Sequence, residues 1–377
     1  MSDRNRFEVV IVGAGIAGSS LAHFLAERGL TDVLLLERET QPGYHATGRS
    51  AASLVELDPN LTVQALKVLG GRFLRNPPEG FSENLVLRQW PIMFLYRDPM
   101  PQTMSDSIAL LEREKIPVTV LSKSEAVARV PVLLPESFGG AVLLPEGGRI
   151  DVHELLSSYL RNARKLGVRV RVGAEVRGIR VENGRCAGVI TADGEIGARM
   201  VVDAAGAWAG KVSALIGAAP IKLEPRRRTI IVFAGPDGMD FGRWPFVVSD
   251  PDHLYFTPES GGLLLSPMDE VPLEPCDAHP DDLIIAQALE RLRKLAPQMV
   301  PHTIQRKWAG LRTFSPDGVV VVGEDPLVKG FFWLAGQAGY GIESSAAVSQ
   351  IAADLIVYGK TERFDPALLA PSRFLKN

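Results

Sequence analysis

A chain of 377 residues is too long for a typical single hydrophobic core, and its length indicates about two domains. Its 46% hydrophobic and 23% charged residues are an ordinary globular composition. The formal net charge is −3 and no basic run is longer than Arg226-Arg227-Arg228, which gives no reason to expect nucleic acid or an anionic membrane as a partner.

The two cysteines, Cys186 and Cys276, are far apart and match neither a CxxC motif nor the Cys/His spacing of a zinc site. We therefore expect no disulfide framework, no metal, and a reduced, cytoplasmic compartment. The N-terminal apolar run is interrupted by Gly13 and Gly15 and lacks a small-residue cleavage pattern, so we expect neither a signal peptide nor a membrane span.

The first elements predict a dinucleotide site. The short apolar run Val9–Val12 is typical of a buried strand, and it leads directly into Gly13-x-Gly15-x-x-Gly18 and a helix. In this motif the glycines permit a tight turn, close approach of the backbone to a pyrophosphate, and close packing of helix and strand. Glu37 ends the next strand 19 residues after Gly18, close to the roughly 20 expected for an acid that binds ribose hydroxyls. A plain glycine-rich turn is the alternative, and the motif alone does not distinguish FAD from NAD.

The following segments alternate between helix and strand. Residues 41–54 are expected to form a glycine-punctuated loop. Asp151 is a candidate N-cap for the last of the helices predicted in this part of the chain. The predicted elements are a helix at 61–74, a strand at 88–96, a helix at 105–114, a strand at 139–144, a helix from 151 to about 166, and a strand at 168–172.

The rest of the chain returns to the same pattern. Residues 174–202 alternate apolar and polar, with turns at Asn183-Gly184 and Asp193-Gly194, which indicates a small layer of hairpins. A buried strand then leads into Ala205-Gly206-Ala207, whose small residues allow another group to approach the backbone closely. Later predicted elements are strands at 226–233, 253–258, 261–267 and 331–336, a helix at 281–295, and a C-terminal segment, 337–356, that starts in glycines and becomes helix.

This order predicts an α/β, Rossmann-type nucleotide-binding domain made of residues 1–87, 149–220 and 314–377. The two excursions, residues 88–148 and 221–313, are expected to form a second, α+β substrate domain around a mixed β-sheet.

Three segments together carry a family resemblance. These segments are VIVGAGIAG…LLLE, VVDAAGAWAG and SPDGVVVVGEDP…FFWLAGQAGYGI. Across nearly its whole length the chain resembles the D-amino-acid oxidase and glycine/sarcosine oxidase superfamily of FAD proteins. A closer resemblance lies in GYHATGRSAA, RRRT, LYFTP, WAGLRTF and GFFWLAGQAGYGI. In these segments the chain resembles the FAD-dependent D-arginine dehydrogenases. The resemblance implies a noncovalent FAD, with its ADP half on the first glycine turn and its isoalloxazine ring against the GRSAA loop and the C-terminal glycine turn. The second and third glycine segments favour FAD over NAD.

The resemblance also assigns the residues expected to bind the cofactor. They are Gly13, Ala14, Gly15, Ile16, Ala17, Gly18, Glu37, Arg38, His45, Gly48, Arg49, Ser50, Ala51, Ala52, Val176, Ala205, Gly206, Trp208, Gly310, Gly336, Gln337, Ala338, Gly339, Tyr340, Gly341 and Ile342.

The implied reaction is hydride transfer from the α carbon of a D-amino acid to flavin N5, which gives an imino acid that hydrolyses to a 2-oxo acid and ammonia. Arg312 matches the carboxylate-binding arginine of the family, and an arginine fork suits a carboxylate better than a lysine does. Pairing of Arg312 with Asp317 or with carbonyls is the alternative. Arg228 matches a second substrate arginine, and strand alternation places it on one face with Arg226 and opposite Arg227; a solvated basic face is the alternative.

Two further groups complete the expected substrate site. Tyr255 is expected to offer its hydroxyl to the same carboxylate, although a tyrosine in the core is the alternative. Backbone carbonyls at Gly339 and Tyr340 are expected to take the substrate's amino protons. The six histidines form no cluster and there is no obvious general base.

The pocket departs from the D-arginine enzymes. Ile92 stands where they carry an acid, and Ser53 where they carry a histidine. We expect an apolar pocket that includes Ile92 and Phe246, together with Met93 and Val248, and a hydrophobic D-amino acid or an imino acid as substrate. An inward turn of the loop that carries Glu56 and Asp58 would restore a negative wall.

The strand KWAGLRTF lacks the cysteine that tethers flavin in sarcosine oxidases, and GGLLLSPMDE lacks the lysine they use to activate oxygen. We therefore favour a dehydrogenase that passes electrons to a quinone or another acceptor. The alternatives are an amine, sarcosine- or proline-type, or 2-hydroxyacid oxidase of the same superfamily, and a non-catalytic flavoprotein. The oligomeric state stays open.

Overall fold

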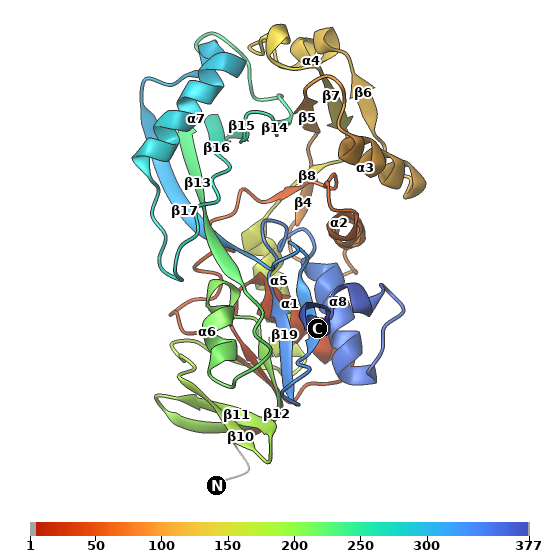
Figure 1. The fold of residues 1–377 in the computed structure, drawn as a ribbon, viewed down its shortest axis with the longest axis vertical. Coiled ribbons are helices and arrows are strands. Elements are labelled where there is room, and N and C mark those ends of the chain that lie inside the picture. Colours follow the sequence, from red (N-terminus) through yellow and green to blue (C-terminus); the bar gives the residue numbers. More distant parts are fainter. Residues whose placement is uncertain (1–4, 376–377) are drawn as a thin grey trace.

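The fold contains two eight-stranded sheets and one small three-stranded sheet (Figure 1). The structure is a computed structural model, and it describes residues 5–375. The first sheet has the order β10-β11-β12-β1-β2-β9, and β19 joins it beside β12 and carries β18. Its strands are β1 (Arg6–Val12), β2 (Val33–Leu36), β9 (Arg169–Arg171), β10 (Gly178–Glu182), β11 (Arg185–Thr191), β12 (Gly194–Asp203), β18 (Val321–Glu324) and β19 (Phe331–Ala335).

The centre of this sheet is parallel: β1 lies between β2 and β12, β9 extends it beyond β2, and β19 extends it beyond β12. The carboxyl ends of β1, β2 and β12 therefore meet at one edge, where Gly13, Glu37 and Ala204 follow the strands directly. In open α/β sheets this edge is where ligands bind.

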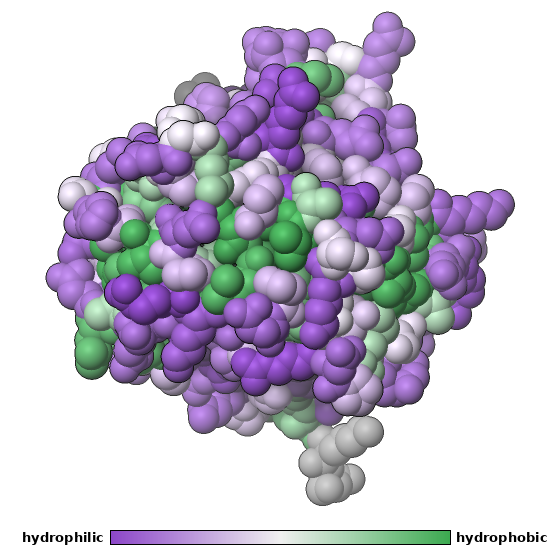
Figure 2. All heavy atoms as spheres, turned by 90° about the horizontal axis from the view of Figure 1, so that it is seen from above, coloured by the Kyte–Doolittle hydropathy of each residue, from purple (hydrophilic) through white to green (hydrophobic). Residues whose placement is uncertain are grey.

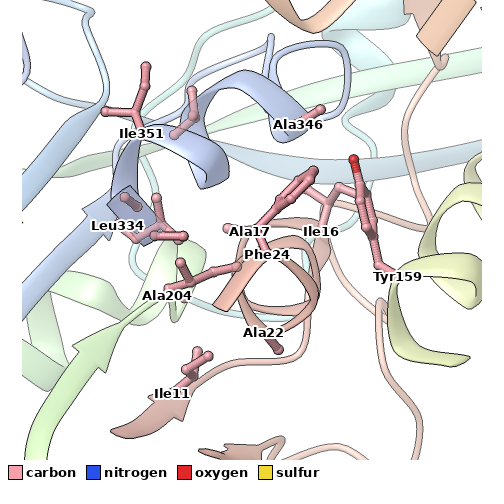
Figure 3. Close-up of a cluster of buried hydrophobic side chains, with 14 of the residues drawn as sticks. Ile11, Ile16, Ala17, Ala22, Phe24, Tyr159, Ala204, Leu334, Ala346 and Ile351 are labelled. Carbon is pink, nitrogen blue, oxygen red and sulfur yellow. The ribbon is translucent and has the colours of Figure 1, made fainter. Parts of the chain in front are cut away.

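Helices α1 (Ile16–Glu27), α5 (Val152–Lys165) and α8 (Ser345–Tyr358) pack together on this sheet. All but one of the α1 residues are buried, so this helix is enclosed by its neighbours. Figure 3 shows Phe24 of α1 beside Tyr159 of α5, and Ile351 of α8 belongs to the same buried cluster. The predicted cap of α5 is confirmed, because the Asp151 carboxylate accepts a hydrogen bond from Glu154 N at 2.9 Å.

The second sheet has the order β17-β13-β16-β15-β14-β5-β7-β6. Its strands are β5 (Ile92–Tyr96), β6 (Thr119–Leu121), β7 (Gly140–Leu144), β13 (Glu224–Phe233), β14 (Phe246–Ser249), β15 (Leu254–Glu259), β16 (Gly262–Ser266) and β17 (Ile304–Phe314). The remaining helices are α2 (Leu61–Arg75), α3 (Gln102–Arg113), α4 (Lys123–Arg129), α6 (Ala209–Ala214) and α7 (Asp282–Leu295). Of these, α3, α4 and α7 lie at the end of the molecule that carries the second sheet (Figure 1).

The third sheet corrects one prediction. It consists of β3 (Ser53–Leu54), β8 (Gly148–Ile150) and β4 (Leu87–Gln89). The single strand predicted at 88–96 is in fact two strands, since β4 belongs to this small sheet and β5 to the second sheet. The chain changes sheets at Pro91, which has no N–H to continue a ladder.

The α/β class and the mixed second sheet are confirmed, since β14 pairs parallel with β5 and antiparallel with β15. The predicted hairpins are also confirmed: both turns, Asn183-Gly184 and Asp193-Gly194, contain residues with positive φ. Strands β6, β8 and β14 and helices α4 and α6 lay outside the predicted elements, and β3 lies in the segment predicted as a loop. The division into two domains stays a prediction, and residues 1–4 and 376–377 of its first and last segments lie outside the described residues.

Between residues 5 and 375, no helix is long and apolar enough to cross a membrane. Figure 2 views the molecule from the end that carries α4 and α7, where apolar patches are enclosed by hydrophilic side chains.

Candidate cofactor and substrate site

The glycine turn after β1 has the close contacts that the motif predicts. Gly13 has φ +103°, and a Cβ there would lie 2.5 Å from the carbonyl oxygen of Ala204 at the end of β12. A Cβ on Gly18 would lie 1.9 Å from the Gly13 carbonyl oxygen. Both positions therefore require glycine. Gly13 lets the turn approach the end of β12, and Gly18 lets α1 approach the turn.

Glu37 lies beside this turn. One carboxylate oxygen accepts a hydrogen bond from Ala14 N and the other from Glu39 N, both at 2.9 Å. Thr47, which the sequence did not suggest, accepts a hydrogen bond from Ile16 N at 3.0 Å and so caps the start of α1. No local pattern marks Thr47, because its partner is 31 residues away.

A cavity of about 300 Å³ opens beside these residues. Eleven of the predicted cofactor residues line it: Gly13, Gly15, Glu37, Arg38, His45, Arg49, Val176, Ala205, Gly206, Trp208 and Gly310. Lining residues that were not predicted include Tyr44, Thr47, Lys211 and Cys276. The other predicted cofactor residues do not line it: Ala14, Ile16, Ala17, Gly18, Gly48, Ser50, Ala51, Ala52, Gly336, Gln337, Ala338, Gly339, Tyr340, Gly341 and Ile342.

Aromatic and cationic groups form one wall of the cavity. The Arg38 guanidinium lies 3.9 Å from the centre of the Trp208 ring, and the His45 ring centre lies 4.6 Å from that of Trp208. The His45 Nε2 atom lies 2.9 Å from a Glu39 oxygen, and this hydrogen bond lowers the pKa of Glu39. The wall presents flat groups suited to stacking on a planar ligand.

The loop before α7 reaches across to the same cavity. Asp277 forms an ion pair with Arg49 at 2.6 Å and accepts a hydrogen bond from the Tyr44 hydroxyl at 3.2 Å. The hydrogen bond from Arg49 lowers the pKa of Asp277. These contacts connect loop 41–54 to the region of the second sheet.

A buried carboxyl group ends β12. Asp203 is fully buried, and its Oδ1 accepts a hydrogen bond from Ala205 N at 3.1 Å. Its Oδ2 has no hydrogen-bond partner among residues 5–375. Burial raises the pKa of Asp203 to about 8, so this group holds its proton at neutral pH.

Arg312 lies in β17 and is almost completely buried. It is 8% exposed, and among the described residues no carboxylate lies within ion-pair distance of its guanidinium. Burial lowers its pKa and Tyr255 opposes that shift, so the tyrosine hydroxyl lies close enough to interact with it. The alternative partner, Asp317, is engaged by Arg373, with Nε 2.8 Å from Oδ2.

The three consecutive arginines of β13 alternate as predicted. Arg226 and Arg228 both bind the Glu270 carboxylate, at 3.0 and 2.8 Å. Arg227 lies on the other face, 3.0 Å from Asp269. Arg228 thus already has a carboxylate partner. A substrate carboxylate would have to share Arg228 with Glu270 or displace Glu270 from it.

Three of the predicted pocket residues lie together. Ile92, Phe246 and Val248 belong to one buried cluster with Tyr255, whose ring centre is 5.0 Å from that of Phe246. The expectation for Met93 is wrong, because Met93 belongs to the cluster on the opposite face of the sheet. Neighbouring strand residues point to opposite faces, so Ile92 and Met93 cannot line one pocket.

The loop that was expected to restore a negative wall does not offer free acids. Glu56 is 1% exposed and pairs with Arg75, and Asp58 pairs with Lys67 at 2.7 Å. Neither acid of this loop therefore adds a free carboxylate to the apolar cluster around Ile92.

The C-terminal glycine turn contributes Gly339. A Cβ on Gly339 would lie 3.6 Å from Arg312 Cδ, so the turn lies directly against the arginine. The Tyr340 carbonyl already accepts two hydrogen bonds from Ser344, one from its backbone N–H at 3.1 Å and one from its side-chain hydroxyl at 2.8 Å. The Gly339 carbonyl accepts none within the part of the chain that the structure describes, so it remains available as an acceptor.

The described residues contain no group of three or more His, Cys, Asp or Glu that could hold a metal ion. Neither cysteine forms a disulfide; Cys186 is buried and Cys276 is exposed.

Comparison with known proteins agrees with this geometry. The family described as "DAO: FAD dependent oxidoreductase" matches residues 8–355. Glycine oxidase of Pseudomonas putida is 30% identical over 272 residues, which cover 71% of this chain and 71% of that protein. Mitochondrial dimethylglycine dehydrogenase of Rattus norvegicus is 25% identical over 400 residues, and the match covers 99% of this chain and 45% of that longer protein. The solved structure of L-proline dehydrogenase from P. horikoshii has a TM-score of 0.86 at 24% identity, with 98% of both chains covered.

The residues at the sheet edge fit a dinucleotide. Gly13 and Gly18 form a turn into which no Cβ fits, the Glu37 carboxylate lies beside it, and a cavity continues from the turn toward Gly310. The finer resemblance to D-arginine dehydrogenases stays a prediction. The chain belongs to the DAO family of FAD-dependent oxidoreductases, and its cofactor is FAD.

Proposed function

We propose that this protein oxidises a D-amino acid with an apolar side chain at its α carbon, and releases an imino acid that hydrolyses to a 2-oxo acid and ammonia. The observation that carries the proposal is Arg312, a buried guanidinium with no carboxylate partner among residues 5–375. A buried cation of this kind is costly to desolvate unless an anion pairs with it. The carboxylate of the substrate is that anion.

Each neighbouring group has a part in holding the substrate. Arg312 binds the carboxylate through two parallel charge-assisted hydrogen bonds, and the Tyr255 hydroxyl donates a third. The Gly339 carbonyl accepts an N–H of the substrate amine, which fixes the amine on the other side of the α carbon. Orientation at two points holds the α C–H in one direction.

The side chain of the substrate lies against Ile92, Phe246 and Val248, which belong to one buried apolar cluster. FAD, when bound, supplies the acceptor for the hydride that leaves the α carbon. The cofactor is expected to be noncovalent, since no cysteine stands on β17. Arg228 stays a candidate for a second contact with the carboxylate.

A dehydrogenase that delivers electrons to a quinone or another acceptor is favoured, because β16 carries no lysine. The two free cysteines support a reducing, cytoplasmic compartment. The division into an FAD-binding domain and a substrate domain remains part of this proposal.

A second candidate follows from the relatives. Glycine oxidase, dimethylglycine dehydrogenase and L-proline dehydrogenase are named for substrates with a carboxylate beside an amine but without a D-configured side chain. Arg312 and Gly339 would hold glycine, an N-methylated glycine or proline by the same two contacts. The stereochemistry of the substrate therefore has to be measured.

The test is anaerobic reduction of the flavin by a panel of D-amino acids, L-amino acids, N-methylglycines, proline and 2-hydroxy acids. Apolar D-amino acids should bleach the flavin of the wild type, and Arg312→Ala should lower the apparent second-order rate of reduction by 10²-fold or more. Arg226→Ala is the matched control, because Arg226 is the residue aligned with Arg312 across the β13–β17 ladder but pairs with Glu224.

Bleaching by proline or N-methylglycines instead would support the second candidate. Fast reoxidation in air with release of peroxide would favour an oxidase. If no member of the panel reduced the flavin, the catalytic proposal would be rejected in favour of a non-catalytic flavoprotein.

A further inference from the structure

Two buried charged side chains and one half-buried one lie together where α2 meets the start of α8. Lys67 Nζ lies 2.7 Å from an Asp58 oxygen and 3.5 Å from a Glu343 oxygen. The side chains of Lys67 and Glu343 are 8% and 6% exposed. Burial alone would lower the pKa of Lys67, but Glu343 and Asp58 raise it above its ordinary value. Burial in turn raises the pKa of Glu343 to about 7, and the charge of Lys67 opposes that shift. We call this group of three residues the clasp.

The clasp joins two segments that are far apart in the chain. Glu343 directly follows Ile342, the last residue of the glycine turn 336–342, and its second carboxylate oxygen accepts a hydrogen bond from Val55 N at 2.6 Å. Asp58 ends the segment 51–58, and one of its oxygens accepts a hydrogen bond from Asn60 N at 2.9 Å. Lys67 thus holds the turn and the segment from the side of α2.

The contact between the two helices leaves no room for adjustment. A Cβ on Gly70 of α2 would lie 2.1 Å from the Glu343 carbonyl oxygen, so the α2 backbone touches the start of α8. Asp58 is also held from α3, since the Ser107 hydroxyl donates to its carbonyl at 2.6 Å. The relative position of the turn and the segment is fixed by backbone and ionic contacts together.

Both segments reach the proposed reaction site. The glycine turn carries Gly339, which lies against Arg312, and the segment carries Leu57, which belongs to the same buried cluster as Ile92 and Phe246. A shift of one relative to the other would change the distance between the group that binds the amine and the wall that holds the side chain. A displacement of about 1 Å at a reacting centre can cost 10²-fold in rate.

We propose that Lys67, Asp58 and Glu343 position the two walls of the reaction site, so that the clasp sets the orientation of the substrate and of the flavin rather than the stability of the fold. This inference rests on the proposed function for the substrate and on FAD binding for the flavin. Neutralising a buried group of charges as a whole removes its desolvation cost together with its attraction. A purely structural clasp would therefore leave the flavin spectrum and the reduction rate little changed when it is neutralised.

The test is the triple variant Asp58→Asn, Lys67→Met, Glu343→Gln. It removes all three charges and leaves oxygen atoms to accept from Asn60 N and Val55 N. The matched control is Glu56→Gln with Arg75→Met, because this buried pair also ties α2 to segment 51–58 but makes no ion pair with the turn 336–343. Both variants are studied as FAD-loaded full-length protein.

We expect the triple variant to unfold at a urea concentration close to that of the wild type and to bind FAD within about threefold. Its visible circular dichroism, which reports the surroundings of the flavin, should differ from that of wild type and control. Its limiting rate of anaerobic flavin reduction should fall 10-fold or more, with the substrate dissociation constant changed less than threefold.

An unchanged flavin spectrum and reduction rate in the triple variant, or equal losses in the control, would overturn the proposal. If the triple variant does not fold, Glu343→Gln alone carries the test, since it leaves the Lys67–Asp58 pair intact and should change the spectrum in the same direction. The spectral comparison needs no substrate. A wild type that no amino acid reduces would therefore refute the proposed function while the spectrum still decides on the clasp.

Discussion

The Arg312 side chain lies beside Gly339, although β17 and the C-terminal glycine turn are formed by separate parts of the chain. A Cβ on Gly339 would be 3.6 Å from Arg312 Cδ and 3.7 Å from its Nε. A buried cation thus lies beside a residue whose carbonyl accepts no hydrogen bond among the described residues. One group suits a carboxylate and the other an amine, and an α-amino acid carries both on neighbouring atoms.

The first prediction concerns the cost of this unpaired cation. Arg312→Met should increase the free energy of unfolding of the substrate-free holoprotein by about 1–3 kcal/mol, because it removes a desolvated charge and keeps an apolar side chain of similar length. The same variant should lose reduction by substrate. Urea denaturation followed by tryptophan fluorescence measures the change.

Arg226→Met is the comparison for this prediction. Its side chain is 32% exposed and pairs with Glu224 and Glu270, so its loss should change stability by less than about 1 kcal/mol. A clear loss of stability in Arg312→Met would show that the guanidinium has a partner in the folded protein, and would count against its role in binding an anion.

The second prediction separates two glycines of the first turn. Gly18→Ala should yield protein without flavin, or no folded protein, since its Cβ would lie 1.9 Å from the Gly13 carbonyl oxygen. Gly15→Ala should fold, because its Cβ would lie 3.3 Å from Thr47 Oγ1 and a small movement relieves the contact. It should bind FAD about 10-fold more weakly, since the methyl group occupies the cavity. Far-ultraviolet circular dichroism and the flavin content after purification distinguish these outcomes.

The features that could be predicted from sequence depend on local patterns. The glycine turn and Glu37 follow from a spacing, the cap at Asp151 from the start of an amphipathic helix, and the shared face of Arg226 and Arg228 from strand alternation. The same alternation would have excluded Met93 from the pocket, and the missing N–H of Pro91 would have divided the strand predicted at 88–96.

The features that could not be predicted depend on contacts between distant residues. Thr47 caps α1 from a loop, and Lys67 meets Glu343 only because α2 packs on α8. From sequence, a lysine in one helix and a glutamate just before another are expected to be solvated surface residues, since charged side chains are mostly exposed. Their burial is visible only when the helices are placed together.

The third prediction concerns Tyr340, whose hydroxyl is a structural group. It accepts a hydrogen bond from Val320 N at 2.7 Å and donates one to the Gly318 carbonyl at 3.1 Å. Tyr340→Phe should lower the free energy of unfolding by about 1–3 kcal/mol, because the buried Val320 N–H loses its partner. The rate of flavin reduction at saturating substrate should stay within about twofold of the wild type.

Tyr255→Phe should show the opposite pattern, with stability little changed and the substrate dissociation constant raised about 10-fold by loss of a hydrogen bond to the carboxylate. Urea denaturation and anaerobic stopped-flow reduction of both variants make the comparison. A loss of substrate affinity in Tyr340→Phe at unchanged stability would reverse the two assignments.

The fourth prediction uses the buried carboxyl of Asp203. Burial raises its pKa to about 8 in the folded protein, whereas an aspartate in an unfolded chain titrates near pH 4. A raised folded-state pKa means that the group's contribution to stability is fully present below about pH 4 and is lost as the pH rises toward 8.

Relative to Asp203→Asn, which cannot ionise, the wild type should therefore lose several kcal/mol of unfolding free energy over this interval, with most of the loss complete by pH 8. The asparagine keeps an oxygen for Ala205 N, and any cost of its unpaired amide is the same at every pH. Urea denaturation of both apoproteins between pH 5 and 9 measures the difference, and parallel stability curves would show that Asp203 is ionised in the folded protein at neutral pH and has a partner for its second oxygen.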